Sequence, residues 1–394
     1  MINLPTNSSY MLPIKVSLRH GIPISGVIEN VSSTVGIPVT VLLRWLDITK
    51  KLDHSNQLDH SDWLTREEIT TLSRAMRIPE AEIMNARMSQ VDAKIAPAKR
   101  RWVSITSARR TRQEITTTLR ISESTRVCPL CISERRPVRL LWRTGWMFAC
   151  TRHQVLLVDT CPTCCLPLGA YRRPARVLIP NCCNNHPPKG LHCQQSLSEI
   201  PTISIERFPK LLQAQGKLEA AMSGRETSLA GKNRTPLDFL RSLREIIEFL
   251  EIAAPVETLC ALPQQVLERV NRHAQIRMLE NNDLRGDSSV LELETTQAFS
   301  VRETKLFAAT IPLALEIARL ESLQAIEDCF MNLVQWHCLT APKNSRPLMA
   351  WATNRTHRKR RSPLFVVFRE LSNRIKHHYG LYDDRKAFQG GSCA

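Results

Sequence analysis

The sequence predicts a mainly α-helical protein in which helix-turn-helix domains flank a central tandem zinc-ribbon-like domain. Two observations lead to this prediction. Nine of the 13 cysteines lie between Cys128 and Cys193, and the stretches on either side carry apolar residues at helical spacing. Apolar residues make up 43% of the chain and charged residues 23%, so we expect a buried core rather than overall disorder.

The charge of the chain predicts a polyanionic partner. Among 394 residues, 54 Lys and Arg face 37 Asp and Glu, a formal net charge of +17, and nucleic acid is the first candidate. No window approaches about 18 consecutive apolar residues. The segment from Met1 to Tyr10 lacks the basic start and apolar core of a secretion signal. We therefore expect a cytoplasmic, nucleoid-associated protein without a membrane partner, whose clustered thiols bind metal rather than form disulfides.

The cysteine cluster and the local density of basic residues divide the chain into four regions. We predict an N-terminal helix-turn-helix domain over residues 1–95 and a basic connector with the tandem zinc-binding domain over 96–205. A C-terminal helical domain over 206–345 and a basic tail over 346–394 complete the chain.

Two similar pieces make up the predicted N-terminal domain. Val31–Leu46 and Leu72–Met84 align so that Ile37-Pro38 matches Ile78-Pro79 and apolar positions coincide. Each predicts a short helix, a turn at Gly36 or Arg77, and a second helix that a proline opens. In helix-turn-helix units the second helix often enters the DNA major groove, which makes Thr40 and Arg44 candidate DNA contacts. Packing alone also produces this pattern in many helical domains.

Basic residues are concentrated in the connector and near the C-terminus. From Lys99 to Arg143, 12 Lys and Arg face only three acidic residues. A phosphate-contacting surface and a solvated arm are both consistent with such a run. The candidate DNA contacts in the two basic segments are Arg109, Arg110, Arg112, Arg358, Lys359, Arg360 and Arg361.

The cysteines have the spacing of zinc ligands. Cys128, Cys131, Cys150 and His153 form C-x2-C-x18-C-x2-H, a complete tetrahedral set. Cys161 and Cys164 open a second set, which Cys193 and either Cys183 or Cys182 would complete. A crossed arrangement that pairs the two knuckles with each other would use the same residues and stays open.

Zinc at such sites is expected to be structural, because three or four cysteines close the coordination sphere, whereas a hydrolytic zinc keeps an open position. Trp142 and Trp146, between the halves of the first set, predict an apolar cap over the metal in preference to a base-stacking platform. No phosphate-binding loop, metalloprotease, serine-hydrolase or dinucleotide motif is present, so we predict a protein that is not an enzyme.

Amphipathic spacing predicts further helices after the cysteines. The expected helices span residues 237–252, 306–320 and 325–339. The apolar run Leu364-Phe-Val-Val-Phe368 predicts a strand by its β-branched and aromatic content.

The central motif resembles the TniQ family, which is related to TnsD. The similarity is carried by Cys128-Pro-Leu-Cys131-Ile-x-Glu134, Arg139-Leu-Leu-Trp142-Arg143 and Trp146-x-Phe148-x-Cys150-x-x-His153. It continues through Leu156-Leu157-x-Asp159-x-Cys161-Pro-x-Cys164-x-x-Pro167-Leu168, Cys183-Asn-Asn and Cys193-x-x-x-Leu197. Weaker similarity, at Leu42-Leu-Arg44, Leu64-Thr-x-Glu67-Glu68 and Leu72-Ser-x-Ala75, extends it over about residues 25–197. Two departures are Cys165, where the family usually has glycine, and the doubled Cys182-Cys183.

The resemblance implies a bacterial, non-catalytic transposition adaptor for target-site selection. Such a protein binds DNA or a CRISPR effector complex and recruits an AAA+ ATPase regulator, similar to TnsC, and the transposase; some relatives are homodimers. It also implies eight zinc ligands for two structural ions: Cys128, Cys131, Cys150, His153, Cys161, Cys164, Cys183 and Cys193. A stand-alone helix-turn-helix transcription regulator with a zinc-stabilised core is the alternative, and a zinc-dependent nuclease is a remote third.

Overall fold

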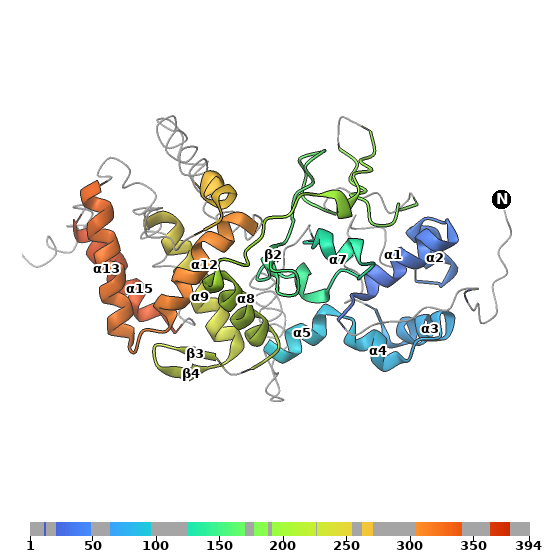
Figure 1. The fold of residues 1–394 in the computed structure, drawn as a ribbon. Helices are drawn as coiled ribbons and strands as arrows, with labels where there is room; N and C mark the ends of the chain where they lie inside the picture. Colours follow the sequence, from blue (N-terminus) through green and yellow to red (C-terminus); the bar gives the residue numbers. More distant parts are fainter. Residues whose placement is uncertain are drawn as a thin grey trace, which may run out of the picture. The chain divides into compact units, whose positions relative to one another are not determined.

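The computed structural model describes residue 12 and residues 21–48, 64–95, 125–169, 177–187, 191–225, 227–253, 262–270, 304–340 and 363–378. These parts are mainly helical, with two short antiparallel hairpins (Figure 1). The chain divides into two compact units. Unit 1 comprises residues 1–225 and 301–304, and unit 2 comprises residues 226–300 and 305–394.

Unit 1 begins with two helix pairs that share one core. The helices are α1 (Ile24–Val35), α2 (Val39–Trp45), α3 (Arg66–Met76) and α4 (Glu80–Asn85). Their inward residues, among them Val31, Leu42, Leu72 and Ile83, lie in one hydrophobic cluster. Apolar positions that match between the two sequence pieces are therefore core positions.

The turns within the two pairs have the predicted form. Gly36 ends α1 with a φ of 73° and Arg77 ends α3 with a φ of 56°, both in the left-handed region. A proline, Pro38 or Pro79, then precedes the second helix. The axes of α1 and α2 differ in direction by 98°. At α3 the sequence adds a capping box, in which Thr65 accepts from the Glu68 backbone N–H and Glu68 accepts from the Thr65 backbone N–H.

The cysteine-rich part of unit 1 has little regular structure. It contains α7 (Pro129–Ser133), the 3₁₀ helices η3 (Leu140–Arg143) and η4 (Leu197–Glu199), and the paired strands β1 (Ala149–Cys150) and β2 (Val155–Leu156). Elements this short leave little backbone pairing to stabilise the chain, so another source of stability is required.

Helices α5 (Met88–Ile95) and α8 (Pro209–Met222) complete unit 1 and contact each other. The buried side chain of Gln215, on α8, accepts hydrogen bonds from the backbone N–H groups of Phe148 and Ala149, each at 2.9 Å. This contact attaches strand β1, which carries a predicted metal ligand, to a long helix.

Side-chain contacts also connect the first helix pair to the cysteine-rich part. Arg143 donates to the hydroxyl of buried Ser25 on α1 at 2.7 Å, and Leu178 packs in the core of the helix pairs. Within unit 1 the helix pairs and the cysteine-rich part are therefore one packed structure.

In the part of the chain that the structure describes, unit 2 includes the hairpin of β3 (Thr227–Leu229) and β4 (Lys232–Arg234) and several long helices. The helices are α9 (Pro236–Ala253), α12 (Thr304–Ala318), α13 (Leu323–Thr340) and α15 (Phe365–His378). The first three of these helices confirm the predicted amphipathic segments, with bounds that differ by a few residues.

The strand predicted at residues 364–368 is wrong, because these residues begin helix α15. Leu364, Val367, Phe368 and Leu371 are buried on one face with helical spacing. The ring of Phe368 stacks at 5.3 Å from that of Phe330 on α13, and Phe330 lies 4.6 Å from Phe249 on α9. Tertiary packing of this aromatic core outweighs the local strand propensity.

Candidate metal centres

Two groups of cysteine and histidine side chains converge in unit 1. The first contains Cys128, Cys131, Cys150 and His153, and the second contains Cys161, Cys164, Cys183 and Cys193. Within each group the potential ligand atoms all lie within 4.8 Å of one another. The eight predicted residues are thus brought together as two consecutive sets, and the crossed arrangement is not the one observed.

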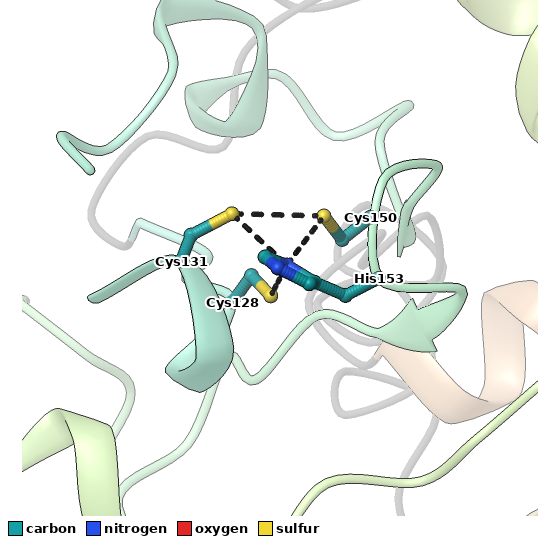
Figure 2. A group of neighbouring side chains, drawn as sticks. All are labelled: Cys128, Cys131, Cys150 and His153. Atoms are coloured by element: carbon teal, nitrogen blue, oxygen red, sulfur yellow. Dashed lines mark hydrogen bonds between the residues drawn. The ribbon is translucent and has the colours of Figure 1, made fainter. Parts of the chain in front are cut away.

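In the first set, the Nδ1 atom of His153 faces three sulfurs (Figure 2). It lies 3.4 Å from Sγ of Cys128, 3.3 Å from Cys131 and 3.7 Å from Cys150, and the Cys131 and Cys150 sulfurs are 3.8 Å apart. Zinc with Zn–S bonds of about 2.3 Å and a Zn–N bond of about 2.0 Å would set separations of about 3.8 Å and 3.5 Å in a tetrahedron. The four side chains therefore fit one tetrahedral ion.

Each half of this set comes from a tight local structure. Cys128 precedes the one-turn helix α7, which Pro129 opens and which ends just past Cys131. Cys150 ends strand β1, and the turn to β2 contains Gln154 with a φ of 51°. Two intervening residues in each knuckle place both ligands on the same side of the turn.

The pKa values of neighbouring thiols in the first set shift in opposite directions, which favours the binding of a cation there. Hydrogen bonds from Cys128 and Cys131 lower the pKa of the Cys150 thiol below its ordinary value. The hydrogen bonds with Cys128 and Cys150, together with burial, raise the pKa of Cys131. Three crowded sulfurs thus cannot all ionise by themselves, whereas a divalent ion would stabilise all three as thiolates.

Glu134 holds the other side of the histidine ring. Its Oε1 lies 2.9 Å from His153 Nε2, and its Oε2 pairs with Arg136 and Arg152. The hydrogen bond with His153 is the largest cause that lowers the pKa of the Glu134 carboxyl. An ionised carboxylate on Nε2 places the ring proton there and leaves Nδ1 as the metal-facing lone pair. Glu134 belongs to the motif around the first knuckle, but no sequence pattern assigns it this role.

The second set is closed by four sulfurs. Cys161 and Cys193 are 3.7 Å apart and Cys164 and Cys183 are 3.8 Å apart, again the separations of a tetrahedral site. The Asn185 amide donates to Sγ of Cys164 at 3.6 Å and to the Pro167 carbonyl at 3.0 Å. Burial is the largest cause that raises the pKa of the Cys183 thiol.

The two open questions about this set have structural answers. Cys183 is buried in the set, whereas neighbouring Cys182 is only half-buried. The backbone of Cys182 pairs with that of Ser196 in an isolated antiparallel β-bridge. Adjacent residues of an extended chain face opposite sides, so only one of the two cysteines can face the set. Cys165 is exposed and has a φ of 55°, a backbone conformation that glycine adopts most easily. A glycine at this position would serve the same turn without the strain of a Cβ.

Trp142 and Trp146 are 1% and 0% exposed, so they are core residues and offer no surface for base stacking. Arg126, counted among the basic connector residues, is also fully buried. It donates to the carbonyls of Gly145 and Met147, and burial lowers its pKa to about 10 against the opposing effect of Asp159. Arg126 therefore supports the tryptophan loop rather than a phosphate.

Two of the predicted DNA contacts lie among the residues that the structure describes. Arg109, Arg110, Arg112, Arg358, Lys359, Arg360 and Arg361 lie outside the described residues. Thr40 and Arg44 lie on α2, where Arg44 is exposed and Thr40 half-buried, one turn apart on the outer face. The inner face of α2 carries the buried Val39, Leu42 and Leu43.

No single helix among those that the structure describes combines the length and apolarity of a bilayer span. The bent pair α1–α2 reaches both by length and composition when its two helices are taken together.

Comparison with known proteins identifies one family. Residues 15–157 match the model of the TniQ family, whose members are associated with transposition. No curated protein matches the sequence. The matched segment contains both helix pairs and all four ligands of the first set. Both sets could hold metal ions and are consistent with zinc, and the match over residues 15–157 supports a TniQ-family protein.

Proposed function

We propose that the chain is a non-catalytic adaptor that selects target sites during transposition. It binds DNA, a CRISPR effector complex or both, and recruits an AAA+ regulator and, through it, the transposase. The observation that carries this proposal is the family match over residues 15–157, because that family is associated with transposition.

The metal sites act in this proposal as structural zinc centres. Cysteine and histidine occupy all four corners of the first set and cysteine all four of the second, so a bound zinc has no corner left for water. Zinc binding and folding are coupled in domains with so little regular structure. The sites hold unit 1 together and take no part in chemistry.

The α1–α2 pair is the DNA-reading element in this proposal. Its 98° bend is within the range of helix-turn-helix units, and its second helix presents Thr40, Arg44 and Trp45 outward. Trp45 is 41% exposed on this face. The outer face of α4 carries Glu80 and Glu82 instead, which phosphates would repel. The α3–α4 pair therefore serves packing or protein contact.

Association with a purified AAA+ regulator from the same transposon tests the adaptor role. We expect the regulator to be retained on the tagged, zinc-loaded chain, with duplex DNA or a guide complex present, at low salt. No retention under any of these conditions would reject the proposal.

A stand-alone transcription regulator is favoured by the same α2 surface. Selection of binding sites from a random duplex library separates the two functions. A regulator would enrich one operator-like motif and bind it without partners, and deleting it would leave transposition unchanged.

A further inference from the structure

Two arginines pair with Glu134 at the first metal set, and a third exposed arginine follows Glu134 directly in the chain. Arg135 and Arg136 follow the first knuckle, and Arg152 lies between the ligands Cys150 and His153. Oε2 of Glu134 lies 2.8 Å from Nε of Arg136 and 3.3 Å from Nε of Arg152. All three arginines are exposed. One carboxylate thus joins cations from two separate segments of the chain.

The metal ligands bring these two segments together. Cys128 and Cys131 belong to the segment that continues into Arg135 and Arg136, and Cys150 and His153 flank Arg152. Glu134 spans the junction, because its Oε1 lies 2.9 Å from His153 Nε2. The arginine cluster is therefore a product of the closed ligand set.

The geometry of the ion pairs suits a phosphate. A planar guanidinium offers one edge at Nε and another between its two terminal nitrogens. Glu134 lies against Nε in both Arg136 and Arg152, so the terminal edge of each is directed away from the carboxylate. The side chains of Arg136 and Arg152 are 46% and 53% exposed. Guanidinium edges of this kind bind phosphate oxygens in a bidentate manner.

The local charge favours the same ligand. Arg136 and Arg152 pair with one glutamate here, and exposed Arg135 lies between Glu134 and Arg136 in a chain with a net charge of +17. We propose that Arg135, Arg136 and Arg152 form a surface that contacts the phosphodiester backbone of DNA and that metal binding at the first set assembles it. The proposal rests on the proposed DNA-binding function and adds a contact surface distinct from α2.

The test compares two triple variants of the full, zinc-loaded chain. R135Q/R136Q/R152Q removes the proposed surface, and R66Q/R74Q/R207Q removes the same charge from exposed arginines elsewhere in unit 1. Affinity for a fluorescent 30-base-pair duplex is measured by anisotropy between about 50 and 300 mM KCl, the range in which phosphate contacts dominate the salt dependence. Zinc content and melting temperature verify that both variants fold.

We expect R135Q/R136Q/R152Q to weaken binding at least about tenfold and to reduce the slope of log K against log salt by about 2 to 3, since each phosphate contact contributes about 0.9. The control should change the slope by less than about 1. The single variant R152Q should reduce it by about 0.9, which keeps the test decisive if the triple variant folds poorly.

Equal slopes for the two triple variants would overturn the proposed surface while leaving DNA binding intact. In that case, selective loss of the AAA+ regulator from R135Q/R136Q/R152Q would assign the arginines to an acidic protein. Failure of the wild-type chain to bind any duplex would instead reject the DNA-binding part of the proposed function, and this inference with it.

Discussion

Glu134 and His153 form a carboxylate–histidine pair at the first metal set. Oε1 of Glu134 lies 2.9 Å from Nε2 of His153, while Nδ1 of the same ring faces the three sulfurs. Such pairs fix the ring orientation and the tautomer of a metal-ligating histidine. Glu134 therefore positions a ligand without itself touching the metal.

Replacing Glu134 by alanine should loosen the metal without removing a ligand. We expect Glu134→Ala to weaken metal affinity by about 10- to 100-fold, the usual effect of losing such a partner. Competition with a chromophoric chelator measures this loss. The matched control is Glu206→Ala, which removes another exposed glutamate of unit 1 and should keep wild-type affinity. Equal affinity in both variants would show that Glu134 has no positioning role.

Gln215 should be needed for the stability of unit 1. Its Oε1 accepts from two buried backbone N–H groups, those of Phe148 and Ala149. Gln215→Ala leaves both donors without this acceptor and should cost about 2 to 6 kcal/mol of unfolding free energy, from about 1 to 3 kcal/mol for each group. Denaturant titration measures the change. Gln213→Ala, at an exposed position of the same helix, should lie within about 0.5 kcal/mol of wild type.

Replacing two glycines by alanine, one within α8 and one just after it, should change the stability of unit 1 in opposite directions. A Cβ at Gly224 would lie 2.8 Å from the Lys94 carbonyl oxygen, at a φ of 79°. Gly224→Ala should destabilise unit 1 by about 1 to 3 kcal/mol. Gly216 has open space around it within the helix, so Gly216→Ala should stabilise by about 0.5 to 1 kcal/mol. Thermal melts of both variants decide the matter, and a shared sign would contradict the packing of α5 on α8.

The left-handed turns of the helix pairs allow a similar comparison. Arg77 holds a φ of 56° where Gly36 holds 73° in the first pair. Arg77→Gly should stabilise the chain by up to about 1 kcal/mol, because glycine removes the strain of a Cβ in this region. Gly36→Ala should cost about 1 kcal/mol, although nothing lies within 4 Å of its Cβ position. A destabilised Arg77→Gly would indicate that the arginine side chain contributes more than the turn.

Much of this architecture is readable from the sequence because its signals are local. The spacing of Cys128, Cys131, Cys150 and His153 follows from the reach of a two-residue knuckle. The turns at Gly36 and Arg77 are predicted by the spacing of the apolar residues and by the proline two residues after each turn residue. Each of these features depends on residues close together in the chain.

The features that the sequence does not reveal depend on contacts between distant residues. Gln215 reaches strand β1 from a helix more than 60 residues away, and no short pattern marks it. Arg126 is buried and donates to carbonyls of the loop that carries the tryptophans, about 20 residues away in the chain. The strand-like run at residues 364–368 is helical because α15 packs its apolar face against α13. In each case tertiary packing overrides local propensity or charge.

The metal content of ligand variants tests the central claim most directly. The claim is that eight residues hold two structural zinc ions that unit 1 needs to fold. Native mass spectrometry of the wild-type chain should show two zinc ions, and Cys182→Ser and Cys165→Ser should keep both. Cys183→Ser should lose one ion and melt at a lower temperature, because zinc binding supplies folding free energy. Two zinc ions and an unchanged melting temperature in Cys183→Ser would contradict the account.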